Sequence, residues 1–397
     1  MVRRTAEQQL RALARRHPVV TLTGPRQSGK TTLTRQVFRG KPYVSLEAPD
    51  VREYALRDPR GFLGEFPRGA VIDEVQNVPS LVSYLQGIVD EDPAPGRFIL
   101  TGSQNLALQS AVSQSLAGRT ALMLLLPLGR EEVERFPKHP SGLFDSLLAG
   151  GYPAIHQRRP PPSEWLADYI ATYLERDVRR LLGVADLLAF QRFLRLAAAH
   201  SAQLINFSRL AADAGMSHNT ASAWLGVLEA SYIVMRLPAF HGNVGKRIVK
   251  APKLCFLDSG LLAWLLGIRD AEQLRHHPLR GAVFESWVAS EVVKAQAHHG
   301  QPVGVEHYRD RHGTEVDLVA EAGQARWLIE AKSGETVGSD FFDALARVAP
   351  LVEEEGRRVE RIVVYGGEAA QRRSQGRVIP WSKIAQVDWA RGVRDGR

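Results

Sequence analysis

The sequence predicts an α/β protein with a parallel-sheet domain first, a helical and winged-helix-like middle, and a second α/β domain in the tail. Three observations lead to this prediction. A glycine-rich phosphate-binding loop follows an apolar run near the start of the chain. Apolar runs and helix-compatible segments alternate over residues 1–130, which favours a parallel sheet covered by helices. Two acidic strand patterns lie between residues 315 and 332.

The domain boundaries follow from changes in this pattern. At 397 residues the chain is too long for one ordinary core, so several domains are expected. After the sheet domain at 1–130, residues 131–185 are mainly helical and form a lid or linker that a proline run interrupts. We expect a winged-helix-like domain at 186–270 and the tail domain at 271–397. The expected strands of the first domain are 19–23, 43–46, 70–73, 98–101 and 121–126.

Composition and charge restrict the class of protein. The chain is 44% hydrophobic, has a formal net charge of +8 and a pI near 9.7, which favours polyanionic partners such as nucleic acid. The arginines are dispersed along the sequence, so the alternative explanation of the positive charge is that many arginines are solvated or form ion pairs on the surface. Cys255 is the only cysteine. No intramolecular disulfide can form, and an intracellular location fits.

Export and membrane insertion are not expected. The basic amino-terminal stretch lacks the apolar core and the small-residue cleavage site of a secretory signal. The longest apolar run, 121–128, contains Pro127 and is far shorter than the roughly 20 residues that span a bilayer. We therefore expect a soluble, cytoplasmic protein without a membrane partner.

The phosphate-binding loop predicts a nucleotide site. Its glycines let backbone N–H groups close around phosphate oxygens, Lys30 can reach the β- and γ-phosphates, and the Thr31 hydroxyl can ligate magnesium. ATP and Mg²⁺ are the expected cofactors. The predicted cofactor-binding residues are Gly24, Pro25, Arg26, Gln27, Ser28, Gly29, Lys30, Thr31 and Thr32.

A second acidic strand strengthens this prediction. The apolar run 70–72 ends in Asp73 and Glu74, as expected of a buried strand that delivers carboxylates to the edge of a parallel sheet. We expect Asp73 to hold magnesium through water and Glu74 to activate the attacking water. Hydrolysis of the nucleotide is therefore predicted; a strand that simply ends in solvated acids is the alternative.

The run 97–103 is a third strand pattern and ends in small polar residues. Thr101 and Ser103 are placed to sense the γ-phosphate or to orient water. A turn in which Ser103 caps the next helix is the other interpretation, and both can hold together.

Arg119 precedes the last apolar run of the first domain. At a sheet edge it can reach the γ-phosphate of a neighbouring subunit as an arginine finger, which predicts a homo-oligomer. A surface ion pair is the alternative role.

A helix-turn-helix pattern occupies the middle of the chain. A short helix from residue 207 and a turn at Gly215 lead to a second helix that Ser217 caps and that runs to Glu229. His218, Asn219, Thr220 and Ser222 are expected at its exposed start. Residues 232–237 and 253–257 can form a hairpin whose loop carries Lys246, Arg247 and Lys250. The module can bind DNA, or, as a resemblance of the chain to AAA-type ATPases implies, it can serve as an ATPase lid or a subunit contact.

The tail contains a second candidate active site. Asp317 and Glu330 lie thirteen residues apart, enough for two paired strands and a turn, and Glu330 and Lys332 share one strand face. These two acids can bind Mg²⁺ or Mn²⁺, with Lys332 orienting water during phosphodiester cleavage. Glu285, on an apolar helix-compatible segment, is an additional acid.

The chain resembles a bacterial family of AAA-type P-loop ATPases with an uncharacterised, restriction-endonuclease-like C-terminal domain. This resemblance implies an intracellular, oligomeric ATPase. The tail departs from the nuclease pattern in one respect, because Val316 rather than proline precedes Asp317. Related folds also persist as noncatalytic binding domains. The resemblance rests on residues 24–31, 71–74, 100–103, 115–119 and 173–177 and on the tail motifs.

Two functions are consistent with these patterns. The first is an ATP-hydrolysing, DNA-associated motor or switch coupled to a nuclease-like tail. The second is a nucleotide-dependent protein-interaction switch with a catalytically inactive tail. Salt-sensitive DNA binding separates them, because phosphate neutralisation makes log affinity fall with log salt.

Overall fold

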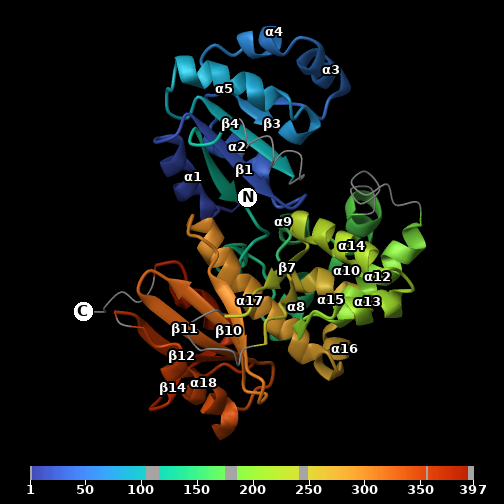
Figure 1. The fold of residues 1–397 in the computed structure, drawn as a ribbon, viewed down its shortest axis with the longest axis vertical. Helices are drawn as coiled ribbons and strands as arrows, with labels where there is room; N and C mark the ends of the chain where they lie inside the picture. The colour runs from blue at the N-terminus through green and yellow to red at the C-terminus, as the bar shows by residue number, and fades with distance from the viewer. Residues whose placement is uncertain (1, 104–115, 175–185, 241–248, 355, 392–397) are drawn as a thin grey trace. The chain divides into compact units, whose positions relative to one another are not determined.

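The computed structural model describes residues 2–103, 116–174, 186–240, 249–354 and 356–391 (Figure 1). The chain divides into two compact units. The first comprises Met1–Pro127 with two short returning segments, Ala230–Tyr232 and Ala297–Gly300. The second comprises Leu128–Glu229, Ile233–Gln296 and Gln301–Arg397.

The first unit is a five-stranded sheet flanked by helices. Neighbouring strands follow the order β2-β3-β4-β1-β5, and every pair is parallel. All strands therefore end at the same edge of the sheet. The elements are α1 Ala6–Ala14, β1 Val19–Gly24, α2 Lys30–Val37, β2 Tyr43–Ser45, α3 Pro49–Arg57, α4 Pro59–Gly64, β3 Val71–Asp73, the 3₁₀ turn η1 Val75–Asn77, α5 Leu81–Glu91, β4 Phe98–Ser103 and β5 Thr120–Leu124.

The five strands expected from the apolar runs are confirmed, and their ends differ by one or two residues. β4 continues two residues further than expected, to Ser103, because Thr23 and Gly24 of β1 remain paired with Gly102 and Ser103.

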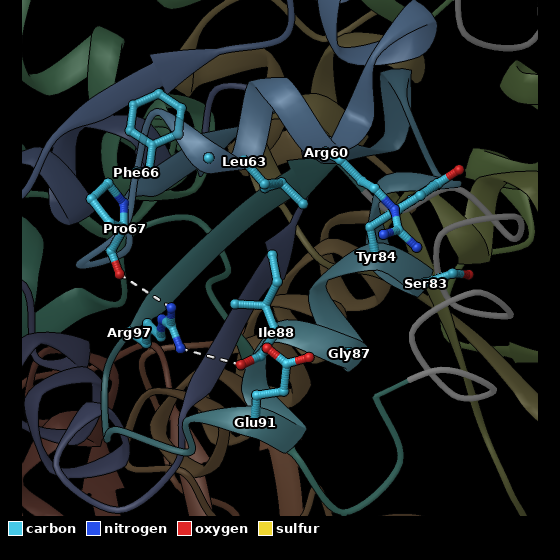
Figure 2. Close-up of a pocket in the computed structure, with 11 residues that line it drawn as sticks. Arg60, Leu63, Phe66, Pro67, Ser83, Tyr84, Gly87, Ile88, Glu91 and Arg97 are labelled. Carbon is cyan, nitrogen blue, oxygen red and sulfur yellow. Dashed lines mark hydrogen bonds between the residues drawn. The ribbon is translucent and has the colours of Figure 1, made fainter.

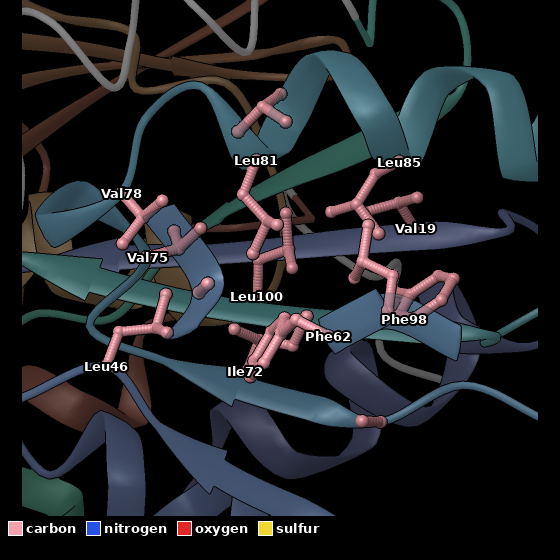
Figure 3. Packing of buried hydrophobic residues seen from close by; sticks show 14 of the residues in the cluster. Val19, Leu46, Phe62, Ile72, Val75, Val78, Leu81, Leu85, Phe98 and Leu100 are labelled. Atoms are coloured by element: carbon pink, nitrogen blue, oxygen red, sulfur yellow. The ribbon is translucent and has the colours of Figure 1, made fainter. Parts of the chain in front are cut away.

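Alternating side chains divide the core of this unit between the two faces of the sheet. Phe98 and Leu100 of β4 face α3, α4 and α5, whereas Ile99 between them faces α1 and α2. Figure 3 shows the first of these clusters, in which Ile72, Leu85 and Leu100 lie together between sheet and helix. This period-two burial on both faces is expected of a sheet covered on both sides.

The second unit begins with helices and a small antiparallel sheet. The sheet has the order β6-β8-β7 and joins segments on either side of a helix pair. The elements are α7 Arg130–Glu134, α8 Leu143–Ala149, α9 Pro153–Arg158, α10 Pro162–Tyr169, the π-helical turn η2 Ile170–Leu174, α12 Leu187–Ala199, β6 Gln203–Leu204, α13 Phe207–Ala214, α14 His218–Ala230, β7 Val234–Leu237, β8 Lys253–Phe256, α15 Ser259–Leu265 and α16 Ala271–His276.

A six-stranded mixed sheet forms the rest of this unit. Its order is β13-β14-β12-β11-β10-β9, with β11, β12 and β14 parallel and the remaining pairs antiparallel. The elements are α17 Arg280–His298, β9 Val305–Arg309, β10 Glu315–Ala322, β11 Ala325–Lys332, η4 Ser339–Phe342, α18 Asp343–Val348, η5 Ala349–Leu351, β12 Arg358–Tyr365, β13 Gln371–Arg373, β14 Gly376–Pro380 and η6 Trp381–Gln386.

Several expectations for the second unit are confirmed. The helix pair α13–α14, the antiparallel pairing of β7 with β8, and the pairing of β10 with β11 are all present. Of the predicted loop cations, Lys250 is exposed, while Lys246 and Arg247 lie outside the described residues. Residues 115 and 175–177, which contribute to the family resemblance, also lie outside them.

None of the helices in the described part of the chain is long and apolar enough to cross a membrane. The 19-residue helix α17 approaches the necessary length but carries Glu285, Glu291 and Lys294.

A core substitution tests the packing of the first unit. Leu100 is fully buried on β4, between β1 and β3, so Leu100→Ala should lower the free energy of unfolding by about 2–5 kcal/mol. Leu122 on the edge strand β5 is 57% exposed, and Leu122→Ala should change that free energy by no more than about 0.5 kcal/mol.

Amide hydrogen exchange over β1 and β4 measures both variants. All seven tryptophans lie beyond residue 160, so their fluorescence should report an unchanged second unit in each variant. Equal exchange in the two variants would contradict the assigned packing.

Candidate functional site

The phosphate-binding loop connects β1 to α2 and is shaped by residues with positive φ. Gly24 has φ +149°, and a Cβ there would lie 2.1 Å from the carbonyl oxygen of Leu125, so only glycine fits. Gln27 and Gly29 have φ of 63° and 96°, which curls the backbone just before the helix starts at Lys30. The sequence places the glycines at two of the positions where the curl requires them.

Two polar side chains of this loop, those of Ser28 and Lys30, are buried, whereas Gln27 is exposed. Lys30 is buried, and its Nζ donates to the carbonyl oxygens of Gly24 and Pro25 at 3.0 and 2.8 Å. The Ser28 hydroxyl is also buried and has no hydrogen-bond partner among the described residues. Arg4 supports the loop from outside, donating to the carbonyl oxygens of Ser28 and Leu126. Thr32, predicted to touch the nucleotide, is exposed one residue beyond Thr31.

Asp73 ends β3 and collects three hydroxyl groups. The hydroxyls of Thr31 and Tyr43 donate to its Oδ2 at 2.9 and 2.7 Å, and the hydroxyl of Thr101 donates to its Oδ1. Thr31 lies in the first turn of α2, Tyr43 begins β2, and Thr101 lies near the end of β4. Burial and the Asp73 contact raise the pKa of Tyr43, which keeps its hydroxyl protonated as the donor.

Glu74 and Ser103 are linked by a residue that the sequence prediction missed. The Gln76 side-chain amide donates to the Glu74 carboxylate and, at 3.0 Å, to the Ser103 hydroxyl. Glu74 has φ 57°, a left-handed conformation uncommon outside glycine, which turns the chain sharply after β3. Gln76 thereby joins the two residues expected to handle water.

These groups fit a nucleoside triphosphate and magnesium. Backbone curvature, a buried lysine and an unpartnered buried hydroxyl suit phosphate oxygens, and a hydroxyl beside a carboxylate suits magnesium. When bound, ATP supplies the γ-phosphate to be hydrolysed and magnesium neutralises its charge. Thr31 and Asp73 are the residues that would hold the ion.

Arg119 lies at the other edge of the same sheet. Its backbone carbonyl accepts a hydrogen bond from the N–H of Val19, the first residue of β1. The phosphate loop follows Gly24, the last residue of β1, so Arg119 and the loop lie at opposite ends of this strand. The six residues of β1 span about 20 Å. Arg119 is paired with Asp90 of α5, Nη2 to Oδ2 at 2.9 Å, and this guanidinium lowers the pKa of Asp90. Arg119 therefore cannot act on the nucleotide of its own subunit.

A pocket of about 630 Å³ also lies in the first unit, between α4 and α5 (Figure 2). Leu63, Phe66, Tyr84 and Ile88 line it, and Arg97 donates across it to the carbonyl oxygens of Pro67 and Ile88 at 3.1 and 3.2 Å. Arg97 precedes β4, so the pocket lies at the edge opposite the phosphate loop and is separate from the nucleotide site.

The tail acids come together as predicted, but around a lysine. Asp317 and Glu330 lie on the paired strands β10 and β11, and Lys332 Nζ contacts Glu330 Oε1 at 2.6 Å. Lys253 of β8 inserts its Nζ among Glu285 and Glu315, at 2.7 Å from each, and Asp317 Oδ1, at 3.8 Å. The sequence prediction missed Lys253 and Glu315.

Burial and mutual repulsion shift the protonation of this cluster. Burial and the neighbouring Asp317 raise the pKa of Glu285 to about 8, against the opposing effect of Lys253. Burial and Asp317 likewise raise the pKa of Glu330 to about 7. Burial by itself lowers the pKa of Lys253, but the carboxylates of Glu285, Asp317 and Glu315 raise it above its ordinary value. The lysine therefore stays charged.

The tail site does not fit the divalent ion that the sequence predicted at Asp317 and Glu330. A charged ammonium already stands among the acids and repels a second cation. Asp317 Oδ2 accepts from the backbone N–H of Ala331 at 2.9 Å, so that oxygen is engaged as well.

Comparison with known proteins bears on the first unit most directly. Residues 16–134 match a family described as an AAA domain. Two curated relatives, the uncharacterized proteins Rv2008c of Mycobacterium tuberculosis and Mb2031c of Mycobacterium bovis, are each 34% identical over 338 residues, covering 84% of this chain and 74% of the relative. The chain belongs to the family of these two proteins. Its first unit is an AAA-type P-loop ATPase domain.

The rest of the chain matches families without an assigned role. Residues 141–272 and 280–384 match domains of unknown function, DUF8612 and DUF4143, so the restriction-endonuclease-like tail is not confirmed. Among solved structures, the Walker-type ATPase PABY2304 of Pyrococcus abyssi is 15% identical, with 66% of this chain and 94% of that chain covered and a TM-score of 0.44. This likeness is too distant to inform the function.

Two substitutions separate nucleotide binding from hydrolysis. Lys30→Ala removes a charge-assisted contact to phosphate and should weaken ATP binding about 10- to 100-fold. Glu74→Gln should bind ATP normally but turn it over about 10²- to 10⁴-fold more slowly, because the base that activates water is lost. Equilibrium binding and steady-state phosphate release measure the two effects.

Glu91→Gln is the matched control, since Glu91 is an exposed acid at the end of α5 and should leave both quantities unchanged. Wild-type turnover in Lys30→Ala would refute the assignment of the phosphate loop.

Proposed function

We propose that this protein is an ATP-hydrolysing motor or switch that associates with DNA. The observation that carries the DNA half of the proposal is the helix pair α13–α14, whose leading edge is polar and exposed. The ATPase domain supplies the energy or the switching event. The sections of chain after residue 128 supply the surface that meets the nucleic acid.

In the proposed ATPase cycle, each residue of the nucleotide site has one task. Thr31 and Asp73 hold magnesium, and Glu74 activates the attacking water. Thr101 and Ser103 orient that water or sense the γ-phosphate through their contacts with Asp73 and Gln76. The Gln76 amide donates to Oε2 of Glu74 and so positions the carboxylate, which leaves Oε1 of Glu74 to contact water.

The helix pair is rigidly built. Gly215, at φ 69°, makes the turn after α13, and the Ser217 hydroxyl accepts from the backbone N–H of Thr220 at 3.1 Å, capping α14. Trp224 of α14 packs edge-on against Phe190 and Phe193 of α12, with ring centroids 5.4 and 5.5 Å apart. This packing fixes which side of α14 faces outward.

The outward side suits DNA. His218 and Asn219, at the start of α14, are exposed, and the Arg209 side chain of α13 is 70% exposed. The start of a recognition helix meets base edges, and an exposed arginine meets phosphates. The antiparallel sheet β6-β8-β7 around this pair supports a winged-helix-like module.

A nucleotide-dependent protein-interaction switch is the second candidate. The tail favours it in one respect, because the acids expected to cut DNA already have lysine partners: Lys253 lies beside Glu285 and Asp317, and Lys332 is paired with Glu330. The net charge of +8 nevertheless favours a polyanionic partner.

Substitution of Arg209 tests the DNA surface. Arg209→Ala should weaken binding to DNA of any sequence and reduce the slope of log affinity against log salt by about 1, since one phosphate contact is lost. Fluorescence anisotropy with labelled duplex at several salt concentrations gives this slope.

Arg57→Ala is the matched control. Arg57 is an exposed arginine paired with an acid one helical turn away, as Arg209 is with Asp213, but it lies on α3. Binding of wild-type protein that does not depend on salt would favour the protein-interaction switch instead.

We further propose that the protein is a homo-oligomer in which Arg119 acts across subunits. Its place at the amino edge of the sheet supports this role, because a half-buried arginine there lies far from the nucleotide of its own subunit. Arg119→Ala should then lower turnover by as much as about 10³- to 10⁵-fold while sparing ATP affinity.

Mixing tests the role in trans. Arg119→Ala subunits can receive a finger and Lys30→Ala subunits can donate one, so mixed oligomers should recover part of the activity. Asp90→Ala breaks the ion pair but keeps the guanidinium, and its turnover should stay near wild type. A loss in Asp90→Ala equal to that in Arg119→Ala would assign Arg119 to the ion pair alone.

A further inference from the structure

Lys253 occupies an unusual position for a lysine. Its side chain is 1% exposed. Lys253 is the first residue of β8, the strand that lies between β6 and β7. Buried lysines are rare unless they are paired. Here the pairing is threefold, because acids from α17 and β10 converge on one ammonium group.

The geometry matches an ammonium ion. Lysine offers three N–H donors, and carboxylate oxygens of Glu285, Glu315 and Asp317 surround its Nζ at 2.7, 2.7 and 3.8 Å. A divalent cation would need these same oxygens at about 2.0–2.6 Å. The ammonium and such an ion therefore compete for one position.

The outlying acids of the cluster also have protein partners. Glu330 Oε1 is paired with Lys332, and Lys332 in turn lies over the ring of Phe341. Glu315 Oε2 is paired with Arg309 at 3.2 Å. The protein thus supplies a cation to each flank of the cluster as well as to its centre.

Backbone contacts hold Lys253 in place. The segment before β8 bonds to β9: His307 Nε2 lies 3.0 Å from the carbonyl oxygen of Ala251, and the backbone N–H groups of Phe240 and Val249 donate to His307 and Arg309. Lys253 itself is paired in register with Leu204 and Leu237. The Lys253 side chain therefore cannot leave the cluster without disturbing these hydrogen bonds and strand pairings.

We propose that Lys253 is a built-in cation that replaces the divalent ion of a nuclease, so the tail binds no metal and cuts no DNA. The cluster instead fastens β8, which follows the helix pair α13–α14, to α17 and β10 of the larger sheet. This joint does not depend on whether the helix pair binds DNA.

Manganese provides the test, using the full-length, nucleotide-free protein. Electron paramagnetic resonance should detect the same amount of bound Mn²⁺ in wild type and in Asp317→Asn, because the wild-type cluster binds no manganese. Lys253→Met takes away the ammonium at similar volume and should gain about one such site per chain. Saturating Mn²⁺ should also raise the Tm of Lys253→Met while leaving that of wild type unchanged, because a bound ion stabilises the folded state.

Lys294→Met is the matched control. Lys294 is a buried lysine of α17 paired with Glu291 at 3.0 Å, away from the cluster, and its loss should create no manganese site. Asp317-dependent binding of Mn²⁺ by wild type, or Asp317-dependent cleavage of DNA, would overturn the proposal. So would a folded Lys253→Met protein that binds no manganese. Should that variant not fold, the comparison of wild type with Asp317→Asn decides.

Discussion

The common direction of five strands is the constraint on which the nucleotide site depends. Because β1, β3 and β4 are parallel, the phosphate loop, the acidic pair and the polar end of β4 all reach one edge of the sheet. There Asp73 accepts hydrogen bonds from the hydroxyl groups of three other elements in one partly buried network. An antiparallel pairing of β3 would have placed Asp73 at the opposite edge, where Arg119 lies.

The second unit uses charge in the opposite way. In the first, a carboxylate is surrounded by neutral hydroxyls and can still attract a cation. In the tail, an internal ammonium already satisfies the carboxylates. Breaking such a buried pair by removing one partner is costly, since it leaves an uncompensated charge. The carboxylates of the two units thus differ in their partners, which are hydroxyl groups around Asp73 and the ammonium group of Lys253 in the tail.

The sequence predicted the features that depend on interactions between residues close together in the chain. The phosphate loop, the five strands, the helix pair α13–α14 and the strands of Asp317 and Glu330 could all be predicted, because apolar period and glycine placement act over a few residues. Tyr43, Gln76 and Lys253 were missed. Tyr43 meets Asp73 thirty positions away, and Lys253 meets Glu315 across sixty-two. A lysine in a strand pattern gives no local sign that it will be buried.

We propose that ATP hydrolysis in the first unit is coupled to the binding of a nucleic acid by the second. The most direct test is the steady-state ATP turnover of wild-type protein at low salt, alone and with single-stranded, double-stranded or branched DNA. At least one of these forms should raise the turnover, and added salt should remove the effect. Turnover that is the same with every form of DNA as without it would contradict the coupling.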